Sequence, residues 1–192
     1  MGRTDGAESG EQTPVVVRGA AWTVTGWQTR WLSAHPDEVG SRGWDARLPR
    51  VATFAWLSNP NSAQPVAVVN THFDHRGKTA RIESAKLIAA CVAAEPSTAW
   101  VVLGDLNCLP GSAPLRELAA VGLRQALPDD AAGTEHAWTG RTDRDRIDHI
   151  LVDRSFDVLD AAVDHTRPSG VLPSDHWPVR ARVRLRCAGA RG

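Results

Sequence analysis

Hydrophobic runs separated by turn residues predict an α/β domain whose central strand ends in a polar pair. The apolar run of residues 100–103 lies between Pro96 and the Pro110-Gly111 turn, which predicts a buried strand. Asp105 and Asn107 follow two positions apart and therefore point the same way. A carboxylate and a carboxamide at the rim of a buried sheet are costly unless they are paired or used. The alternative, that they only close the strand in an Asx turn, stays open.

The same periodicities predict the remaining elements. Two β-rich runs, residues 50–57 and 65–71, are separated by turn chemistry and are expected to be antiparallel neighbours. Apolar residues at helical spacing predict a helix over residues 76–95. Ser112 can cap a short helix that ends near Val121. Further strands are expected at residues 15–17, 22–27, 146–152, 157–164 and 179–186, with loops at 33–49 and 128–145.

The last expected strand, residues 179–186, alternates apolar residues with arginines. One of its faces is expected to pack and the other to be basic. We interpret the arginines as the solvated side of an outer strand rather than as a phosphate-binding stripe.

Composition narrows the class of protein. The 192 residues, 42% hydrophobic and 23% charged, fit one domain with its own core. Basic and acidic residues number 22 each, and this zero net charge argues against a surface that coats nucleic acid. No apolar stretch of about 18 residues is present, so no membrane span is expected. The cellular location is taken as cytoplasmic by default, and any export signal is expected upstream of Met1. The sequence does not indicate an oligomeric state.

The three cysteines, Cys91, Cys108 and Cys187, form neither an even set nor a CxxC pair. They predict reduced thiols rather than disulfides or a zinc knuckle. Cys108 lies beside the polar pair, but no base is placed for it in the sequence, so we interpret it as a packing residue.

Four polar clusters lie at the expected strand ends or in the adjoining loops: His72 with Asp74, Asp105 with Asn107, Asp148, and Asp175 with His176. The segments around them read Asn-Thr-His-Phe-Asp-His, Gly-Asp-Leu-Asn, Arg-Ile-Asp-His-Ile-Leu-Val and Pro-Ser-Asp-His-Trp-Pro-Val. In this order they resemble the motifs of the endonuclease/exonuclease/phosphatase superfamily. Residues 31–33, 40–45 and 48–50 resemble one bacterial subgroup, so the likeness covers roughly residues 2–186.

The resemblance implies a four-layer α/β/β/α sandwich of two packed, mostly antiparallel sheets, with the site at the sheet edges. It also implies hydrolysis of a phosphodiester or phosphomonoester by in-line attack of an activated water. Hard oxygen ligands suit Mg²⁺, with Mn²⁺ as the alternative ion, and Asp175 is the family-like metal ligand. The partner is a phosphate-ester substrate, either a small molecule, which the neutral charge slightly favours, or nucleic acid.

The resemblance also implies catalytic roles. Asp105 would position or deprotonate the water, and Asn107 would hold the water or a phosphoryl oxygen. His176, oriented by Asp148, would act as the base or stabilise the pentavalent state. The general base therefore stays open between Asp105 and His176.

Two further residues complete the expected site. His72 would bind the scissile phosphate or protonate the leaving group. Glu11, which lies in a Gly-Glu-x-x-Pro context, would be the orienting carboxylate of His72.

The sequence also departs from the family pattern. Family members begin with a strand that ends in Asn and continue to a Gln-Glu pair whose glutamate grips the metal, and neither feature is found ahead of Gly2. We therefore expect residues 1–192 to form a single domain, incomplete at the N-terminus, with an open sheet edge and a weakened metal site. A misplaced start codon or a truncated gene would explain this, and the upstream reading frame tests it.

Two alternatives to a phosphoesterase are weighed. A non-catalytic remnant of the family would fold or bind a partner without turnover. A zinc metallo-β-lactamase-like hydrolase would use the segment from Thr71 to Gly77, although one histidine of that motif is absent. Turnover of bis-p-nitrophenyl phosphate that is lost in Asp105→Ala would favour the phosphoesterase, and stoichiometric zinc would favour the lactamase fold.

Overall fold

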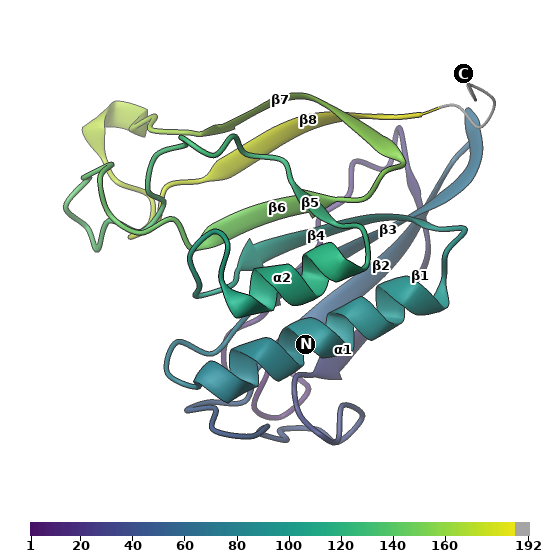
Figure 1. The fold of residues 1–192 in the computed structure, drawn as a ribbon, viewed down its shortest axis with the longest axis horizontal. Helices are drawn as coiled ribbons and strands as arrows, with labels where there is room; N and C mark the ends of the chain where they lie inside the picture. Colours follow the sequence, from purple (N-terminus) through teal and green to yellow (C-terminus); the bar gives the residue numbers. More distant parts are fainter. Residues whose placement is uncertain (187–192) are drawn as a thin grey trace.

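The computed structural model of the protein describes residues 1–186 and shows three stacked layers (Figure 1). Two helices, α1 (Lys78–Ala94) and α2 (Ala113–Ala120), cover one face of a six-stranded sheet, and a two-stranded sheet lies over part of its other face. The six strands are β1 (Thr23–Trp31), β2 (Val51–Asn59), β3 (Ser62–His72), β4 (Ala99–Asp105), β5 (Arg124–Gln125) and β6 (Asp148–Val152). The second sheet pairs β7 (Phe156–Val163) with β8 (Val179–Leu185), and a short 3₁₀ turn, Pro168–Gly170, lies between these two strands.

The topology of the large sheet brings three strand ends to one edge. Its strand order is β1-β2-β3-β4-β6-β5, and only the β3–β4 pair is parallel. Helix α1 makes the crossover between those two strands, so both end at the same edge. Strand β6 is antiparallel to β4 and begins there. In this register His72 lies opposite Asp105, and Asp105 lies opposite Asp148.

Two clusters of apolar side chains form the core. The first lies between the helices and the large sheet and includes Trp100, Leu118 and Ile88. The second lies between the two sheets and includes Val152 and Phe156. The two-stranded sheet leaves part of the large sheet open, because a groove of about 380 Å³ is lined there by Val15, Val17, Trp22, Leu57 and Val68, among others.

Most of the expected elements are confirmed, two expectations need correction, and one short strand was not expected. The two β-rich runs expected to pair are the antiparallel neighbours β2 and β3. Residues 15–17 form no strand and instead line the open groove. The two-residue strand β5 was not expected, because so short a segment carries no periodicity. Within residues 1–186 no helix covers the outer face of β7 and β8, so the expected fourth layer is not among the described elements. No helix in that range is long and apolar enough to cross a bilayer.

The start of α1 is fixed by a residue far away in the chain. The N-cap residue, Gly77, has no side chain, and the Asp45 carboxylate takes over the capping role. Asp45 accepts hydrogen bonds from the amides of Ala80 (2.7 Å) and Thr79 (3.2 Å). These bonds lower the pKa of Asp45, and they tie the loop of residues 33–49 to the helix.

We expect Asp45→Ala to lower the free energy of unfolding, because the amides of Thr79 and Ala80 in the first turn of α1 lose their side-chain cap. Urea denaturation measures the free energy of unfolding. The matched control is Asp37→Ala, which removes a highly exposed carboxylate that pairs with Arg30 at 3.5 Å. Equal losses in the two variants would contradict the capping role.

Candidate active site at the edge of the large sheet

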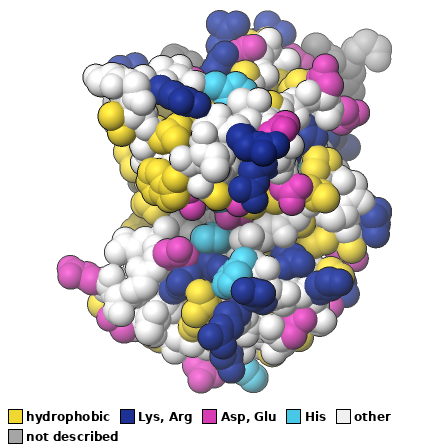
Figure 2. Space-filling view, turned by 90° about the vertical axis from the view of Figure 1, so that its left-hand side faces the viewer, with side chains coloured by type: hydrophobic (Ala, Val, Ile, Leu, Met, Phe, Trp, Pro, Cys, Tyr) yellow, Lys and Arg dark blue, Asp and Glu magenta, His cyan; other side chains and the backbone are white. Residues whose placement is uncertain are grey.

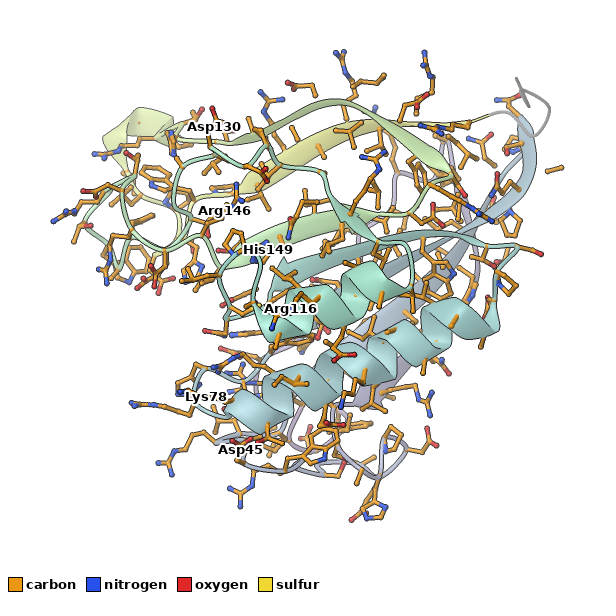
Figure 3. The ribbon with its side chains drawn as sticks, in the orientation of Figure 1. Asp45, Lys78, Arg116, Asp130, Arg146 and His149 are labelled. Atoms are coloured by element: carbon orange, nitrogen blue, oxygen red, sulfur yellow. The ribbon has the colours of Figure 1, made fainter. Side chains whose placement is uncertain are left out.

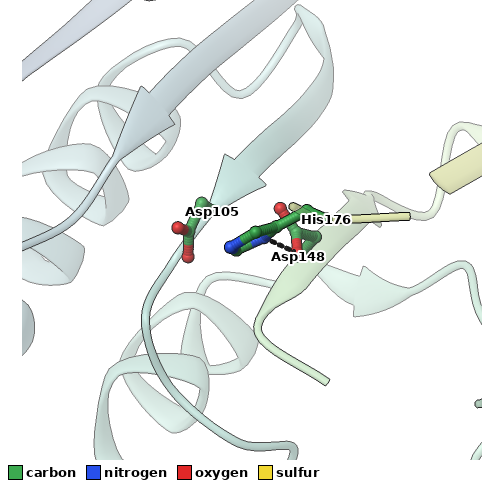
Figure 4. Close-up of side chains that lie close together, drawn as sticks. All are labelled: Asp105, Asp148 and His176. Atoms are coloured by element: carbon green, nitrogen blue, oxygen red, sulfur yellow. Dashed lines mark hydrogen bonds and ion pairs between the residues drawn. The ribbon is translucent and has the colours of Figure 1, made fainter. Parts of the chain in front are cut away.

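The polar clusters named from the sequence meet where β3 and β4 end and β6 begins. His72 Nε2 lies 3.2 Å from Asp105 Oδ2, and His176 Nδ1 lies 2.8 Å from Asp148 Oδ2. Asp105, Asp148 and His176 each offer one atom to a group within 4.8 Å (Figure 4). Figure 2 looks onto this side of the molecule and shows histidine and acidic side chains in a hollow across its middle.

Backbone geometry explains the Gly-Asp-Leu-Asn segment. Gly104 has φ +136°, and a Cβ there would lie 1.8 Å from the carbonyl oxygen of Thr71, so only glycine fits. Asn107 has φ +47°, a left-handed conformation that asparagine tolerates better than most residues. Its backbone N–H donates a hydrogen bond to Asp105 Oδ1 (2.8 Å), and its side-chain Nδ2 donates one to the carbonyl oxygen of Phe73 (2.9 Å). Asp105 therefore accepts the Asx-type hydrogen bond and also lies at the sheet edge, so the Asx turn and a place in the site do not exclude one another.

His176 is held against Asp148 by the loop of residues 134–145. The Thr134 hydroxyl accepts hydrogen bonds from the amides of Ile147 (3.0 Å) and Asp148 (3.1 Å) at the start of β6. Glu135 forms an isolated antiparallel bridge with His176. This loop thus brings β6 and the segment before β8 together, although 28 residues separate Asp148 from His176.

His72 lies between two carboxylates. Its Nδ1 is 3.2 Å from Glu11 Oε2, on the side opposite Asp105. Arg50, whose side chain is only 4% exposed, donates to the same Glu11 oxygen at 3.0 Å, and Arg3 pairs with it as well. Glu11 itself is half-exposed, so these arginines fix its position. The sequence reasoning missed this role of Arg50, because 39 residues separate it from Glu11.

The three central titratable groups have shifted pKa values. Burial and the nearby charge of Asp148 raise the pKa of Asp105 to about 6. The hydrogen bond that the His176 imidazolium donates to the Asp148 carboxylate raises the pKa of His176 to about 9, against the effect of burial. Burial and the charge of Arg50 lower the pKa of His72 to about 4. At pH 7, Asp105 is therefore mostly ionised, His176 is protonated and His72 is neutral.

The donor set fits a divalent cation. Two carboxylates on adjacent strands repel one another, which contributes to the raised pKa of Asp105, and a cation between them would relieve that repulsion. Carboxylate oxygens suit Mg²⁺ and Mn²⁺, whereas imidazole suits softer ions and would have to lose its proton to ligate.

Two acidic residues named from the sequence lie elsewhere. Asp74 is buried and accepts hydrogen bonds from the amides of Gly77, Arg76 and Leu48, which hold its pKa well below its ordinary value despite burial. Asp175 is exposed, and its carboxylate contacts the hydroxyl of Ser174 at 3.3 Å outside the group of Asp105, Asp148 and His176. Its role as a metal ligand stays a prediction.

Other sequence interpretations are settled by contacts. Cys108 is buried and burial raises the pKa of its thiol, as a packing residue requires, whereas Cys187 lies outside the described residues. The last strand is an outer strand, and its Arg180 and Arg184, together with Arg186 directly after it, pair with aspartates of β7. His75 Nδ1 lies 3.1 Å from Arg50 Nη2, so a histidine of the segment that the zinc-lactamase alternative would use is engaged in another contact.

The model of the Endonuclease/Exonuclease/phosphatase family matches residues 11–176. The endonuclease/exonuclease/phosphatase from Bacteroides vulgatus has a TM-score of 0.88 and 32% identity, over 96% of this chain and 74% of that chain. A family protein from Bacteroides thetaiotaomicron has a TM-score of 0.85 and 29% identity, over 95% and 72%.

A mannosyl-6-phosphatase from Bacteroides thetaiotaomicron has a TM-score of 0.85 and 28% identity, over 96% of this chain and 75% of that chain. No curated protein matches the sequence. The family assignment excludes the metallo-β-lactamase alternative, because the match spans all the site segments from Glu11 to His176. The chain belongs to the Endonuclease/Exonuclease/phosphatase family.

Proposed function

We propose that this protein is a Mg²⁺- or Mn²⁺-dependent phosphoesterase that hydrolyses its substrate by in-line attack of water. The observation that carries the proposal is the convergence of His72, Asp105, Asp148 and His176 at one sheet edge. These residues come from three strands and a loop, and no structural role requires two carboxylates and two imidazoles at one place.

Asp105 is best suited to be the general base. Its pKa of about 6 makes it ionised at neutral pH yet basic enough to accept a proton from an oriented water. His176 is protonated at that pH, because Asp148 stabilises its imidazolium form, so it would donate a hydrogen bond to a phosphoryl oxygen. The motifs left the general base open between Asp105 and His176, and this division of roles favours Asp105.

His72 would act as an oriented polar group beside the scissile phosphate. Arg50 and Arg3 hold Glu11, and Glu11 holds Nδ1 of the His72 ring. Asn107 would hold the water or a phosphoryl oxygen, next to Asp105. A bound divalent cation would neutralise charge on the phosphoryl oxygens, and one carboxylate oxygen each of Asp105 and Asp148 would hold it. The second oxygen of Asp105 would then accept the proton of the water. Asp175 is kept as a further candidate ligand.

A small sugar phosphate is the substrate class that we favour. One relative, at 28% identity, is a mannosyl-6-phosphatase. The net charge of zero gives no general attraction to a polyanionic duplex. The alternative that we retain is a member of the family that folds or binds a partner without turnover.

The purified protein with Mg²⁺ or Mn²⁺ should hydrolyse mannose 6-phosphate or bis-p-nitrophenyl phosphate. Asp105→Ala should lower kcat by about 10²–10⁴-fold, because the base at the reacting centre is lost. The exposed loop variant Asp129→Ala is the control and should retain activity. Absence of turnover with every ester and both ions would favour the remnant.

The proposed cation site also predicts a cost in stability. The pKa of Asp105 is raised from 3.8 to about 6. The folded state therefore loses stability as pH rises from about 4 to 6, and the loss is complete above that range. In EDTA at pH 7.5, Asp105→Asn should therefore stabilise the protein, by at most about 3 kcal/mol. The gain should shrink at pH 4. Urea denaturation measures both values.

Asp74→Asn is the matched comparison for that experiment. Asp74 is also buried, but its pKa is lowered, so its charge stabilises the fold above pH 4 and its removal should destabilise. Opposite signs for the two aspartates are expected. Destabilisation by Asp105→Asn at pH 7.5 would show that the carboxylate pair carries no strain.

The ion pair of His176 and Asp148 predicts a titration. In metal-free protein the His176 imidazole should titrate near pH 9, and in Asp148→Asn nearer its ordinary value of 6.5. The stability that His176 contributes is complete below about pH 6.5 and is lost as pH rises to about 9. Histidine NMR signals followed against pH make the measurement, and an unchanged midpoint in the variant would contradict the pairing.

A further inference from the structure

We propose that a cavity beside Asn107 is a second anion-binding subsite, which takes a phosphate or carboxylate carried by the leaving group of the substrate. The proposal rests on the phosphoesterase function above and deepens it. It assigns the enzyme to esters with two anionic groups, such as a bisphosphorylated sugar, rather than to neutral alcohol esters.

The cavity lies between the first turns of the two helices. It has a volume of about 360 Å³, and its lining includes Lys78 and Arg81 from α1, Asn107 from the active site, and Ser112 and Pro114 at the start of α2. Asn107 thus belongs to both the active site and the cavity, because its backbone N–H donates to Asp105 and the residue also lines the cavity. A ligand that reaches from the reacting centre past Asn107 enters this space.

The charge of the lining is entirely positive. Two of the lining residues, Lys78 and Arg81, are cations, and none is acidic. Over residues 1–186, neither cation forms an ion pair, although Arg81 Nη1 donates to the carbonyl of Asp74 at 2.8 Å. Lys78 is exposed and lies at the α1 end facing the site (Figure 3), and basic side chains gather below the hollow in Figure 2. Such a pair of unpaired cations in a concave surface favours an anion.

The helices add to this charge unequally. The amides of Thr79 and Ala80 in α1 already bond to Asp45, so that helix end is satisfied. Ser112, the N-cap of α2, makes no side-chain capping bond, which leaves the partial positive charge of this helix facing no protein carboxylate. The helix end supports the subsite, and the cavity with its two cations carries it.

The active site and the cavity beside Asn107 therefore carry opposite charge. The group of Asp105 and Asp148 is acidic and fits a cation and the reacting phosphate, whereas the cavity beside Asn107 is basic and fits a second anion directly. A substrate with one phosphate leaves Lys78 and Arg81 without a partner. A substrate with two anionic groups engages both.

The test compares mannose 1,6-bisphosphate with mannose 6-phosphate in the presence of Mg²⁺. Lys78→Gln should lower the ratio of kcat/KM for the bisphosphate over the monophosphate by about tenfold, the loss expected for one hydrogen bond to a charged group. Lys86→Gln is the matched control, because Lys86 lies on the same helix, is exposed and pairs with Glu83. An unchanged ratio in Lys78→Gln, or no preference for the bisphosphate in the wild type, would overturn the subsite while leaving the phosphoesterase intact.

A binding measurement covers the case in which neither ester is hydrolysed, which would count against the proposed function. Inorganic phosphate is titrated into the EDTA-treated protein, and backbone amide shifts are followed by NMR. Saturable shifts at Lys78, Asn107 and Ala113 that weaken in Lys78→Gln and persist in Lys86→Gln support the subsite. Absence of saturable shifts at these residues overturns it.

Discussion

The structure depends on the placement of two carboxylates, Asp105 and Asp148, opposite one another on adjacent strands. Burial, and then their mutual repulsion, raise the pKa of Asp105, while Asp148 binds the imidazolium of His176. A fold selected only for stability would separate these charges. A cation bound between the two carboxylates would offset their repulsion, and a phosphate would complete the arrangement. The same pair of carboxylates therefore accounts both for the destabilisation of the free protein and for the proposed chemistry.

The topology makes this arrangement possible. A single parallel pair, β3 and β4, ends at one edge and delivers His72 beside Asp105, and the antiparallel strand β6 begins at that edge with Asp148. Gly104 allows the β4 backbone to pass close to Thr71, and the left-handed Asn107 turns the chain away at once. The remaining groups, Glu11 and His176, arrive on loops that are fixed by Arg50 and Thr134. Rigid strands thus carry the centre and pinned loops carry its periphery.

Sequence reasoning found the local features and missed the distant ones. Alternation along a strand and the four motifs placed His72, Asp105, Asp148 and His176 together, and the structure brings them within contact. Asp74 shares a face with His72 by period two, yet three backbone amides capture it, which no periodicity reveals. The anchoring of Glu11 by Arg50 spans 39 residues and the capping of α1 by Asp45 about as many, so neither has a local signal. Residues 15–17 have strand propensity, but they line a groove without forming a ladder.

The most direct test of the central claim is a crystal soaked with Mn²⁺ and measured at the manganese absorption edge. The account predicts an anomalous peak between the carboxylates of Asp105 and Asp148, close to His176. A peak bound only by Asp175, or no peak at this edge of the sheet at millimolar Mn²⁺, would contradict it.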